Sequence, residues 1–354
     1  MKGFWKEDIA KNGKLITNER LRFVRNNHAL KKDQMSYVLE IHFGINSKII
    51  ESLPLGNDPS ASIYRIVDHL NQRYFLKLNK NDVTKQGIQV PFYLYSKGID
   101  AVIPPIVNKK GGLWFSENGF TWVLYPFVQS CNGYEVEFSS FQWRSFGESL
   151  SKIHAVSLSE DLFQSLPKES FKSISCERVK EYDFKMKNTS CNDTESAKLV
   201  DFWKEKRNEI QQLIQNTDQI GRKVRTKTET FDLVLCHADL HPGNTVIDEE
   251  GNLIIVDWDS PILAPKERDL MFIGGGHRFK KPDINAFYNA YGKLEPYFEL
   301  ISYYRNERIL ADIAVTADEI FGNKGTKEER EILLYLLMRQ FELNKEVDVA
   351  LAVH

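Results

Sequence analysis

Cysteine is scarce in this chain of 354 residues, and its four cysteines form no C-x-x-C pair. They are widely spaced, and no histidines accompany them at zinc-finger intervals, so neither a disulfide framework nor a structural metal is indicated. This usage is typical of the reducing cytoplasm, which is the location we expect. The four residues are Cys131, Cys176, Cys191 and Cys236.

The chain also lacks an excess of charge of one sign and any long apolar run. Its formal net charge is −2, and no polybasic segment favours nucleic acid or an anionic membrane as a partner. No segment approaches the roughly 20 consecutive apolar residues that a membrane-spanning helix needs. Residues 1–30 contain no apolar core typical of a signal peptide. We therefore expect a soluble, unexported protein, whose oligomeric state the sequence does not indicate.

The composition is that of a globular protein, with 42% hydrophobic and 27% charged residues. The length exceeds the size at which one core usually keeps growing, so two packed units are expected. Strand patterns dominate before about residue 128, and helical patterns dominate after it. This order predicts an α+β fold with a small strand-rich lobe at residues 31–127 and a larger helical lobe at residues 128–354. The leader, residues 1–30, receives no assignment.

The first of these lobes shows one helical pattern and three strand patterns. From Asp33, apolar positions recur at helical spacing and stop at Gly44. The apolar runs at residues 63–67 and 74–78 are separated by polar residues and predict a hairpin. Another strand is expected over residues 121–128, halted at Pro126.

The second lobe is expected to be mostly helical. Ser140 can cap a helix there, and a single long helix is predicted over residues 195–220. A β-rich stretch at residues 233–258 interrupts the helices. The buried stripe of the capped helix comprises Phe146, Leu150 and Ile153, and that of a later helix comprises Ile309, Ile313 and Ile320.

The interruption contains the residues that indicate a chemical function. Residues 237–244 are followed by two short apolar runs around a polar turn. If these runs form a hairpin, Ile247 lies opposite Leu253, and Asp257 arrives within cross-strand reach of Asn244. An amide oxygen and a carboxylate placed together in this way can hold Mg²⁺, which favours oxygen ligands.

Asp239 stands five residues before Asn244, on the loop that leads into the expected hairpin. Phosphoryl transfer requires this set: an aspartate to orient an attacking hydroxyl and accept its proton, and an asparagine and an aspartate to hold the metal. Any one of Asp239, Asn244 and Asp257 alone is typical of an ordinary turn or strand end. The three together, at this spacing, favour a kinase.

The same region resembles the aminoglycoside phosphotransferase family and, within it, the spectinomycin phosphotransferases. The resemblance rests on Asp257-Trp258-Asp259 and on the string from Leu263 to Gly276, and it extends from about residue 31 to the C-terminal helices, including residues 302–308. It implies a two-lobed protein-kinase-like fold, a nucleotide cofactor, ATP or GTP, and Mg²⁺.

The resemblance also implies roles for individual residues. Asp239 would be the base, and Asn244 and Asp257 would be the metal ligands. Lys77 would hold the α- and β-phosphates, and a lysine stem that only lies along the sheet is the alternative. The adenine would be contacted by the Pro126 carbonyl, which proline retains, and by the Val128 amide.

Two features depart from the usual kinase pattern. Kinases pair the strand lysine with a glutamate of the following helix, but Lys85 stands at about that position here, and no glutamate is near it. The nearest acid is Asp82, or the partner comes from elsewhere in space. The phosphate-covering loop, residues 54–62, is poor in glycine; we expect Ser60 and Ser62 to cap the phosphates, and a solvated linker is the alternative.

Other polar residues are assigned to support or to substrate. His237 and His241 are expected to fix the backbone of the loop, His154 to be a hydrogen-bonded core histidine, and Arg268 with Asp269 to form a buried support, unless they simply begin a helix. A cationic substrate requires carboxylates, and the candidates are Asp259 and Glu307. Asp312 is expected to pair with Arg308 one helical turn away. Trp143 and Tyr303 are expected in the core.

The function favoured by these patterns is phosphorylation of a hydroxyl of an aminocyclitol or aminoglycoside antibiotic, with spectinomycin as the first candidate. One alternative is a metabolic kinase for an amino alcohol or a sugar on the same fold, because fold does not determine substrate. Another is a catalytically inactive binding protein, which the missing helix glutamate makes conceivable and the intact trio of Asp239, Asn244 and Asp257 opposes.

Overall fold

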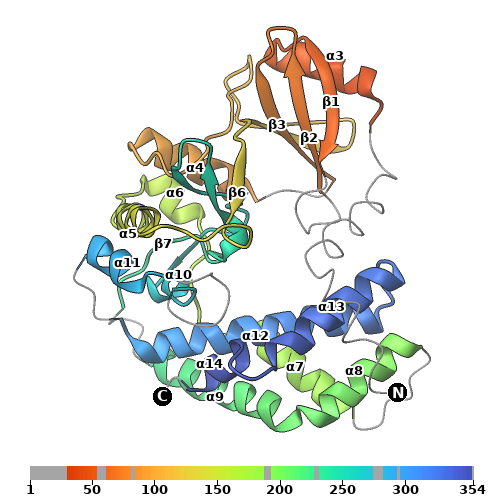
Figure 1. Cartoon of the computed structure of the whole chain (residues 1–354), viewed down its shortest axis with the longest axis vertical. Helices are drawn as coiled ribbons and strands as arrows, with labels where there is room; N and C mark the ends of the chain where they lie inside the picture. Colours follow the sequence, from red (N-terminus) through yellow and green to blue (C-terminus); the bar gives the residue numbers. More distant parts are fainter. Residues whose placement is uncertain are drawn as a thin grey trace. The chain divides into compact units, whose positions relative to one another are not determined.

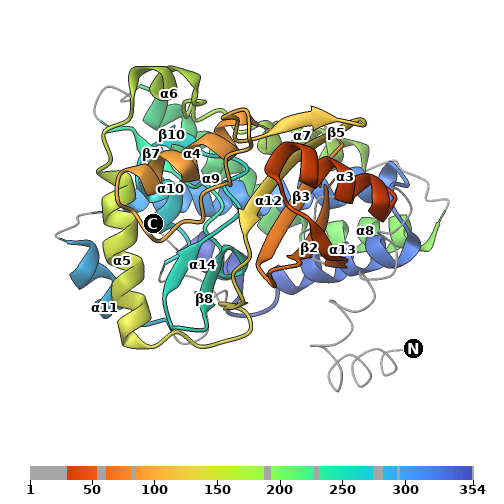
Figure 2. The same ribbon diagram turned by 90° about the horizontal axis from the view of Figure 1, so that it is seen from above.

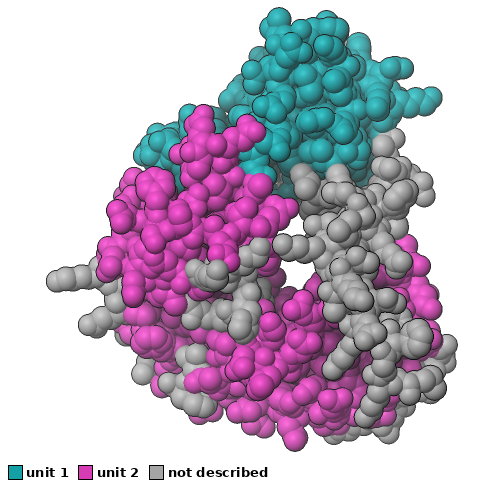
Figure 3. All heavy atoms as spheres, viewed as in Figure 1, with its two compact units in different colours: residues 1–130, 256–259 teal, residues 131–255, 260–354 magenta. Residues whose placement is uncertain are grey.

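The structure is a computed structural model that describes residues 30–53, 61–80, 84–186, 193–226, 231–273, 282–292 and 296–352. The chain divides into two compact units (Figure 3). Unit 1 runs to Ser130 and also contains Val256–Asp259, a segment remote in sequence from the rest of it. Unit 2 comprises Cys131–Ile255 and Ser260–His354.

Unit 1 is built on an antiparallel sheet with the strand order β1-β2-β3-β5-β4. Apolar side chains of the strands alternate toward α3, which lies against the sheet (Figure 1). The predicted hairpin is confirmed as β2 and β3, in which Ile63 is the partner of Lys77, and the strand predicted to end at Pro126 is confirmed as β5. The elements are α3 (Lys32–Phe43), β1 (Ser47–Leu53), β2 (Ala61–Asp68), β3 (Arg73–Asn79), α4 (Lys85–Ser96), β4 (Phe115–Glu117) and β5 (Phe120–Pro126).

Helix α3 begins and ends close to the predicted residues. Met35, Val38 and Leu39 are buried in the core of unit 1. Gly44 follows the helix with φ 75°, a left-handed conformation that glycine adopts without steric cost, and its amide donates to the carbonyls of the last turn.

Unit 2 is mainly helical and contains two small sheets, one pairing β7 with β10 and one with the order β6-β8-β9. β10 was not expected from the sequence. The elements are β6 (Ser130–Asn132), α5 (Ser140–His154), α6 (Glu160–Ser165), α7 (Ile174–Lys185), α8 (Thr194–Glu205), α9 (Arg207–Arg225), β7 (Val234–Cys236), the 3-10 turn η2 (Pro242–Asn244), β8 (Thr245–Asp248), β9 (Leu253–Ile255), β10 (Ile262–Ala264), α10 (Glu267–Leu270), α11 (Ile284–Tyr291), α12 (Phe298–Phe321), α13 (Lys327–Gln340) and α14 (Glu346–Ala352).

The helices of unit 2 form its core. α12 packs against α7 and α9, while α11 lies alongside α5 (Figures 1 and 2). Both predicted buried stripes are confirmed: Phe146, Leu150 and Ile153 on α5 and Ile309, Ile313 and Ile320 on α12 are fully or almost fully buried. Trp143 and Tyr303 lie in the core as expected. Among the described helices, none combines the length and the apolar character needed to cross a bilayer.

The predicted cap of α5 is wrong by one residue. Ser139 is the cap: it has an extended backbone, and its hydroxyl accepts a hydrogen bond from the Gln142 amide at 3.4 Å. Gln142 reciprocates by accepting from the Ser139 amide at 2.8 Å. The Ser140 hydroxyl instead donates to Asp283 at 2.6 Å, a contact with a residue 143 positions away.

The single long helix predicted over residues 195–220 is also wrong, because the chain breaks at Lys206 into α8 and α9. Asp183 of α7 binds both pieces. Its carboxylate accepts hydrogen bonds from Trp203 of α8 at 3.0 Å and from Arg207 and Gln211 of α9 at 2.6 and 2.8 Å. These contacts tie both pieces to α7.

Candidate active site

A buried carboxylate holds the loop that follows β7. Asp269, fully buried at the end of α10, accepts hydrogen bonds from the backbone amides of His237 and Ala238 at 2.9 and 2.8 Å. His154 lies 3.1 Å from the same carboxylate and 2.7 Å from the Tyr291 hydroxyl. Asp269 therefore supports the loop, and His154 is a hydrogen-bonded core residue, as the sequence predicted.

Burial acts to raise the pKa of Asp269, but the hydrogen bond and charge of His154, together with the charge and backbone amide of His237, outweigh it. The pKa of Asp269 consequently lies below its ordinary value. The carboxylate remains charged and holds Ala238 at φ 72°, an unusual conformation for a residue with a side chain. This turn directs the chain into Asp239.

The two histidines that flank Asp239 fix the loop backbone, as predicted. His237 Nδ1 accepts the Asp239 amide at 3.3 Å, and His241 Nδ1 accepts the Gly243 amide at 3.0 Å at the start of η2. The Asn244 side-chain NH₂ donates to the Asp239 carbonyl at 2.9 Å. Asn244 is thus tied to the loop by its nitrogen, and its oxygen is the atom that could bind a metal.

The hairpin after the loop has the predicted register. Ile247 pairs with Leu253, and Thr245 pairs with Ile255. Asn244 therefore precedes the paired segment directly, and Asp257 lies two residues beyond it. Because Asn244 belongs to unit 2 and Asp257 to unit 1, their shared metal site stays a prediction.

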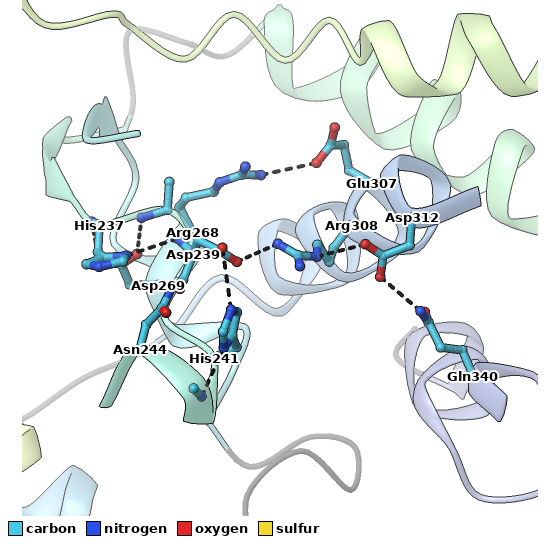
Figure 4. Close-up of polar contacts among 12 residues, drawn as sticks. His237, Asp239, His241, Asn244, Arg268, Asp269, Glu307, Arg308, Asp312 and Gln340 are labelled. Atoms are coloured by element: carbon cyan, nitrogen blue, oxygen red, sulfur yellow. Dashed lines mark hydrogen bonds and ion pairs between the residues drawn. The ribbon is translucent and has the colours of Figure 1, made fainter. Parts of the chain in front are cut away.

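Asp239 is bound by an arginine of α12. Arg308 Nη1 donates to the Asp239 carboxylate at 2.5 Å, and its Nε lies 3.3 Å from Asp312, which accepts a hydrogen bond from Gln340 at 3.0 Å (Figure 4). The predicted ion pair between Arg308 and Asp312 is confirmed. Its extension to Asp239 was missed, although Arg308 lies in residues 302–308, the segment that helped to carry the family resemblance.

The charges around Asp239 favour its ionised form. Burial acts to raise the pKa of Asp239, but the Arg308 guanidinium and, after it, His241 and His237 lower it by more. The pKa of Asp239 therefore lies below its ordinary value. A carboxylate kept ionised can accept a proton from a hydroxyl.

In unit 1, the strand lysine meets two carboxylates. Lys77 Nζ on β3 lies 2.8 and 2.9 Å from the two oxygens of Asp259 and 3.3 Å from Asp257. Burial acts to lower the pKa of Lys77, but the attraction of Asp257 and Asp259 is stronger and raises it above its ordinary value. Lys77 is thus a partly buried cation within unit 1, next to one of the two residues predicted to bind metal.

The structure describes some of the remaining predicted residues and not others. Pro126 ends β5, and Val128 follows two residues later. Ser62 lies in β2 opposite Leu78, not in a loop as expected, whereas Ser60 is outside the described residues. Glu307 accepts hydrogen bonds from Arg268 at 3.2 Å and from the Ser173 hydroxyl at 3.4 Å. The structure also does not describe residues 1–29 of the leader, Asp82, Cys191 or the glycines at residues 274–276.

Comparison with known proteins identifies the family. A model described as APH, the phosphotransferase enzyme family, matches residues 54–294, more than half of the chain. The crystal structure of spectinomycin phosphotransferase APH(9)-Ia with ADP and spectinomycin is similar to this chain with 29% identity and a TM-score of 0.86, over 92% of this chain and 99% of that one.

Two other structures are also similar. The AMP-bound complex of the same spectinomycin phosphotransferase has 28% identity and a TM-score of 0.81, over 92% of this chain and 100% of that one. Amicoumacin kinase hAmiN in complex with AMP-PNP, Ca²⁺ and Ami has 11% identity and a TM-score of 0.56, over 90% and 94%, which shows a common fold. The chain is therefore an enzyme of the aminoglycoside phosphotransferase family, a small-molecule phosphotransferase with the kinase-like fold.

Proposed function

We propose that the protein transfers the γ-phosphoryl group of ATP, or of GTP, to a hydroxyl of a cationic aminocyclitol or aminoglycoside antibiotic, with spectinomycin as the first candidate. The observation that carries the proposal is Asp239, bound by Arg308 on a loop that Asp269 fixes. The similarity to a spectinomycin phosphotransferase over almost the whole chain supports the substrate class.

The chemical step requires one proton acceptor and one set of phosphate ligands. The acceptor hydroxyl oxygen forms a bond to Pγ as the bond from Pγ to the β,γ-bridging oxygen breaks, and the nucleoside diphosphate leaves. Asp239 orients the hydroxyl and takes its proton. The Arg308 guanidinium orients the Asp239 carboxylate through a direct hydrogen bond.

Mg²⁺ would be held by the Asn244 side-chain oxygen and the Asp257 carboxylate. Their donor set fits the ion, which prefers hard oxygen ligands, and the Asn244 nitrogen is already engaged by the loop. When bound, Mg²⁺ neutralises charge on the β- and γ-phosphates.

The nucleotide would be held mainly by residues of unit 1. Lys77 would bind the α- and β-phosphates, and Ser60 and Ser62 would cap them. The Pro126 carbonyl and the Val128 amide would contact the adenine. The phosphate-binding role of Lys77 is supported by its partly buried ammonium group, which forms ion pairs with Asp257 and Asp259.

The substrate ammonium groups require carboxylate partners, for which we propose Glu307 and Asp259. Glu307 is mostly buried and accepts hydrogen bonds from Arg268 and the Ser173 hydroxyl, and a carboxylate has further oxygen lone pairs for a ligand. Asp259 is engaged by Lys77, and a role toward substrate requires it to release that cation.

A phosphate-transfer assay with a panel of acceptors tests the proposal. We expect Mg²⁺-dependent nucleotide consumption stimulated by spectinomycin and reduced by about 10²-fold or more in Asp239→Asn, the scale of a positioned general base. Asp232→Asn, an exposed aspartate of the same region, is the matched control and should retain wild-type turnover.

Other results would replace the proposal. Stimulation by an amino alcohol or a sugar, and not by spectinomycin, would identify a metabolic kinase. Nucleotide binding without transfer to any acceptor, equal in wild type and Asp239→Asn, would indicate a binding protein.

A further inference from the structure

The helix that follows the lysine strand carries no acid. Helix α4 runs from Lys85 to Ser96 with the sequence KQGIQVPFYLYS, which contains neither aspartate nor glutamate. In kinases, a glutamate of the corresponding helix pairs with the strand lysine and holds it against the phosphates. Lys77 therefore requires another anion, because its side chain is only 15% exposed and an unpaired buried ammonium is costly.

That anion comes from the segment after β9. Asp259 places both carboxylate oxygens within hydrogen-bond distance of Lys77 Nζ, at 2.8 and 2.9 Å. Asp257 offers one oxygen at the longer distance of 3.3 Å. Charge-assisted bonds weaken with distance, so that Asp259 is the main partner of the lysine.

The start of α4 is shaped to receive this segment. Thr84, the residue before the helix, does not cap it with its side chain; its hydroxyl donates to the Asp259 carbonyl at 2.6 Å. A Cβ on Gly87 would lie 2.8 Å from the Trp258 carbonyl oxygen and 3.2 Å from the Asp259 Cα. A glycine at this position therefore leaves the space that the backbone of residues 258–259 occupies.

We infer that Asp259 is the positioning residue for Lys77 and replaces the helix glutamate of other kinases, docked against α4 by Thr84 and Gly87. The inference rests on the proposed nucleotide-binding role of Lys77. It gives the two acids of Asp257-Trp258-Asp259 different tasks: the first is left to the metal, and the second holds the lysine. Because both Asp259 oxygens are engaged by Lys77, this role competes with the expected role toward substrate.

Steady-state kinetics on three variants test the inference. Asp259→Asn keeps the shape and removes the charge, Asp259→Glu restores the charge, and Asp82→Asn removes the acid nearest to Lys77 in sequence. For Asp259→Asn we expect kcat/KM for the nucleotide to fall roughly 10- to 100-fold, the scale of a charge-assisted hydrogen bond. The KM for the acceptor should stay within about twofold, Asp259→Glu should recover most of the loss, and Asp82→Asn should match wild type.

The opposite patterns overturn the inference. A loss confined to Asp82→Asn would make that residue the partner, and a loss in Asp259→Asn that appears only in the KM of the acceptor would make Asp259 a substrate ligand. Calorimetric titration of each variant with a non-hydrolysable ATP analogue and Mg²⁺, without acceptor, provides a measurement independent of turnover. If wild type binds the analogue but phosphorylates no acceptor, the proposed function fails, and weaker binding by Asp259→Asn alone still supports the inference.

Discussion

Replacing Asp269 by asparagine tests whether one buried carboxylate holds the active-site loop. The two oxygens of Asp269 face three polar groups: the amides of His237 and Ala238 and the ring of His154. Asparagine has one oxygen, and its NH₂ group would face a donor whichever way the amide turns. At least one buried backbone N–H is then left without an acceptor, and the left-handed turn at Ala238 loses part of its support.

The expected loss of folding stability is a large fraction of the free energy of unfolding of a typical domain. Breaking a buried charged pair by removing one partner costs about 3–5 kcal/mol, and a folded domain has a free energy of unfolding of about 5–15 kcal/mol. We expect Asp269→Asn to lower the free energy of unfolding by about 3–5 kcal/mol. Urea denaturation followed by tryptophan fluorescence measures it, and turnover should fall as well because Asp239 is the next residue after the strained turn.

The pH dependence has a definite sign. The pKa of Asp269 is lowered on folding, so its stabilisation is complete above the unfolded-state pKa of about 3.9 and disappears as the pH falls through the lower folded-state pKa. The deficit of Asp269→Asn should therefore be full at neutral pH and shrink below about pH 4.

The matched control is Asp283→Asn, which changes a half-buried aspartate that also accepts a backbone amide, at the start of α11. Asparagine caps helices as well as aspartate does, so this variant should unfold like wild type. An Asp269→Asn protein that resists urea as well as the Asp283→Asn control would refute the assignment of Asp269 as the support of the loop.

Two further predictions follow from contacts within each unit. Burial alone would raise the pKa of Asp239, and Arg308 lowers it. Arg308→Gln should therefore move the acidic limb of the pH profile of kcat/KM to higher pH, and Arg308→Lys should move it less. An acidic limb that stays in place in Arg308→Gln would contradict the role of the guanidinium. Gly87→Ala should lower the free energy of unfolding by about 1–3 kcal/mol, because its Cβ would overlap the Trp258 carbonyl, and this cost exceeds the gain in helix propensity from alanine. Nucleotide binding should weaken as well. Calorimetry measures both effects beside the exposed control Lys85→Ala, and equal behaviour of the two variants would contradict the predicted contact between Gly87 and Trp258.

The features that the sequence predicted correctly depend on neighbouring residues. The register of β8 and β9 follows from a polar turn between two short apolar runs, and the buried stripes of α5 and α12 follow from helical spacing. The order of Asp239 and Asn244 on one loop is likewise contained in a few consecutive residues. Local hydrogen bonding and periodicity are enough to determine such elements.

Two local predictions were wrong. The helix predicted over residues 195–220 has favourable spacing throughout, yet the chain divides at Lys206 into α8 and α9. Ser140 is a good capping residue in isolation, but Asp283 takes its hydroxyl, and Ser139 performs the capping.

By itself, then, the sequence determined the kinase-like loop, its hairpin and the helical and strand-rich parts of the chain. Only the tertiary structure decided that Lys77 pairs with Asp259, 182 residues further along, and that Arg308 reaches Asp239, 69 residues before it. The reason is physical: backbone periodicity and turns are set by adjacent residues, whereas the partner of a buried charge is whichever opposite charge the fold brings within about 3 Å of it.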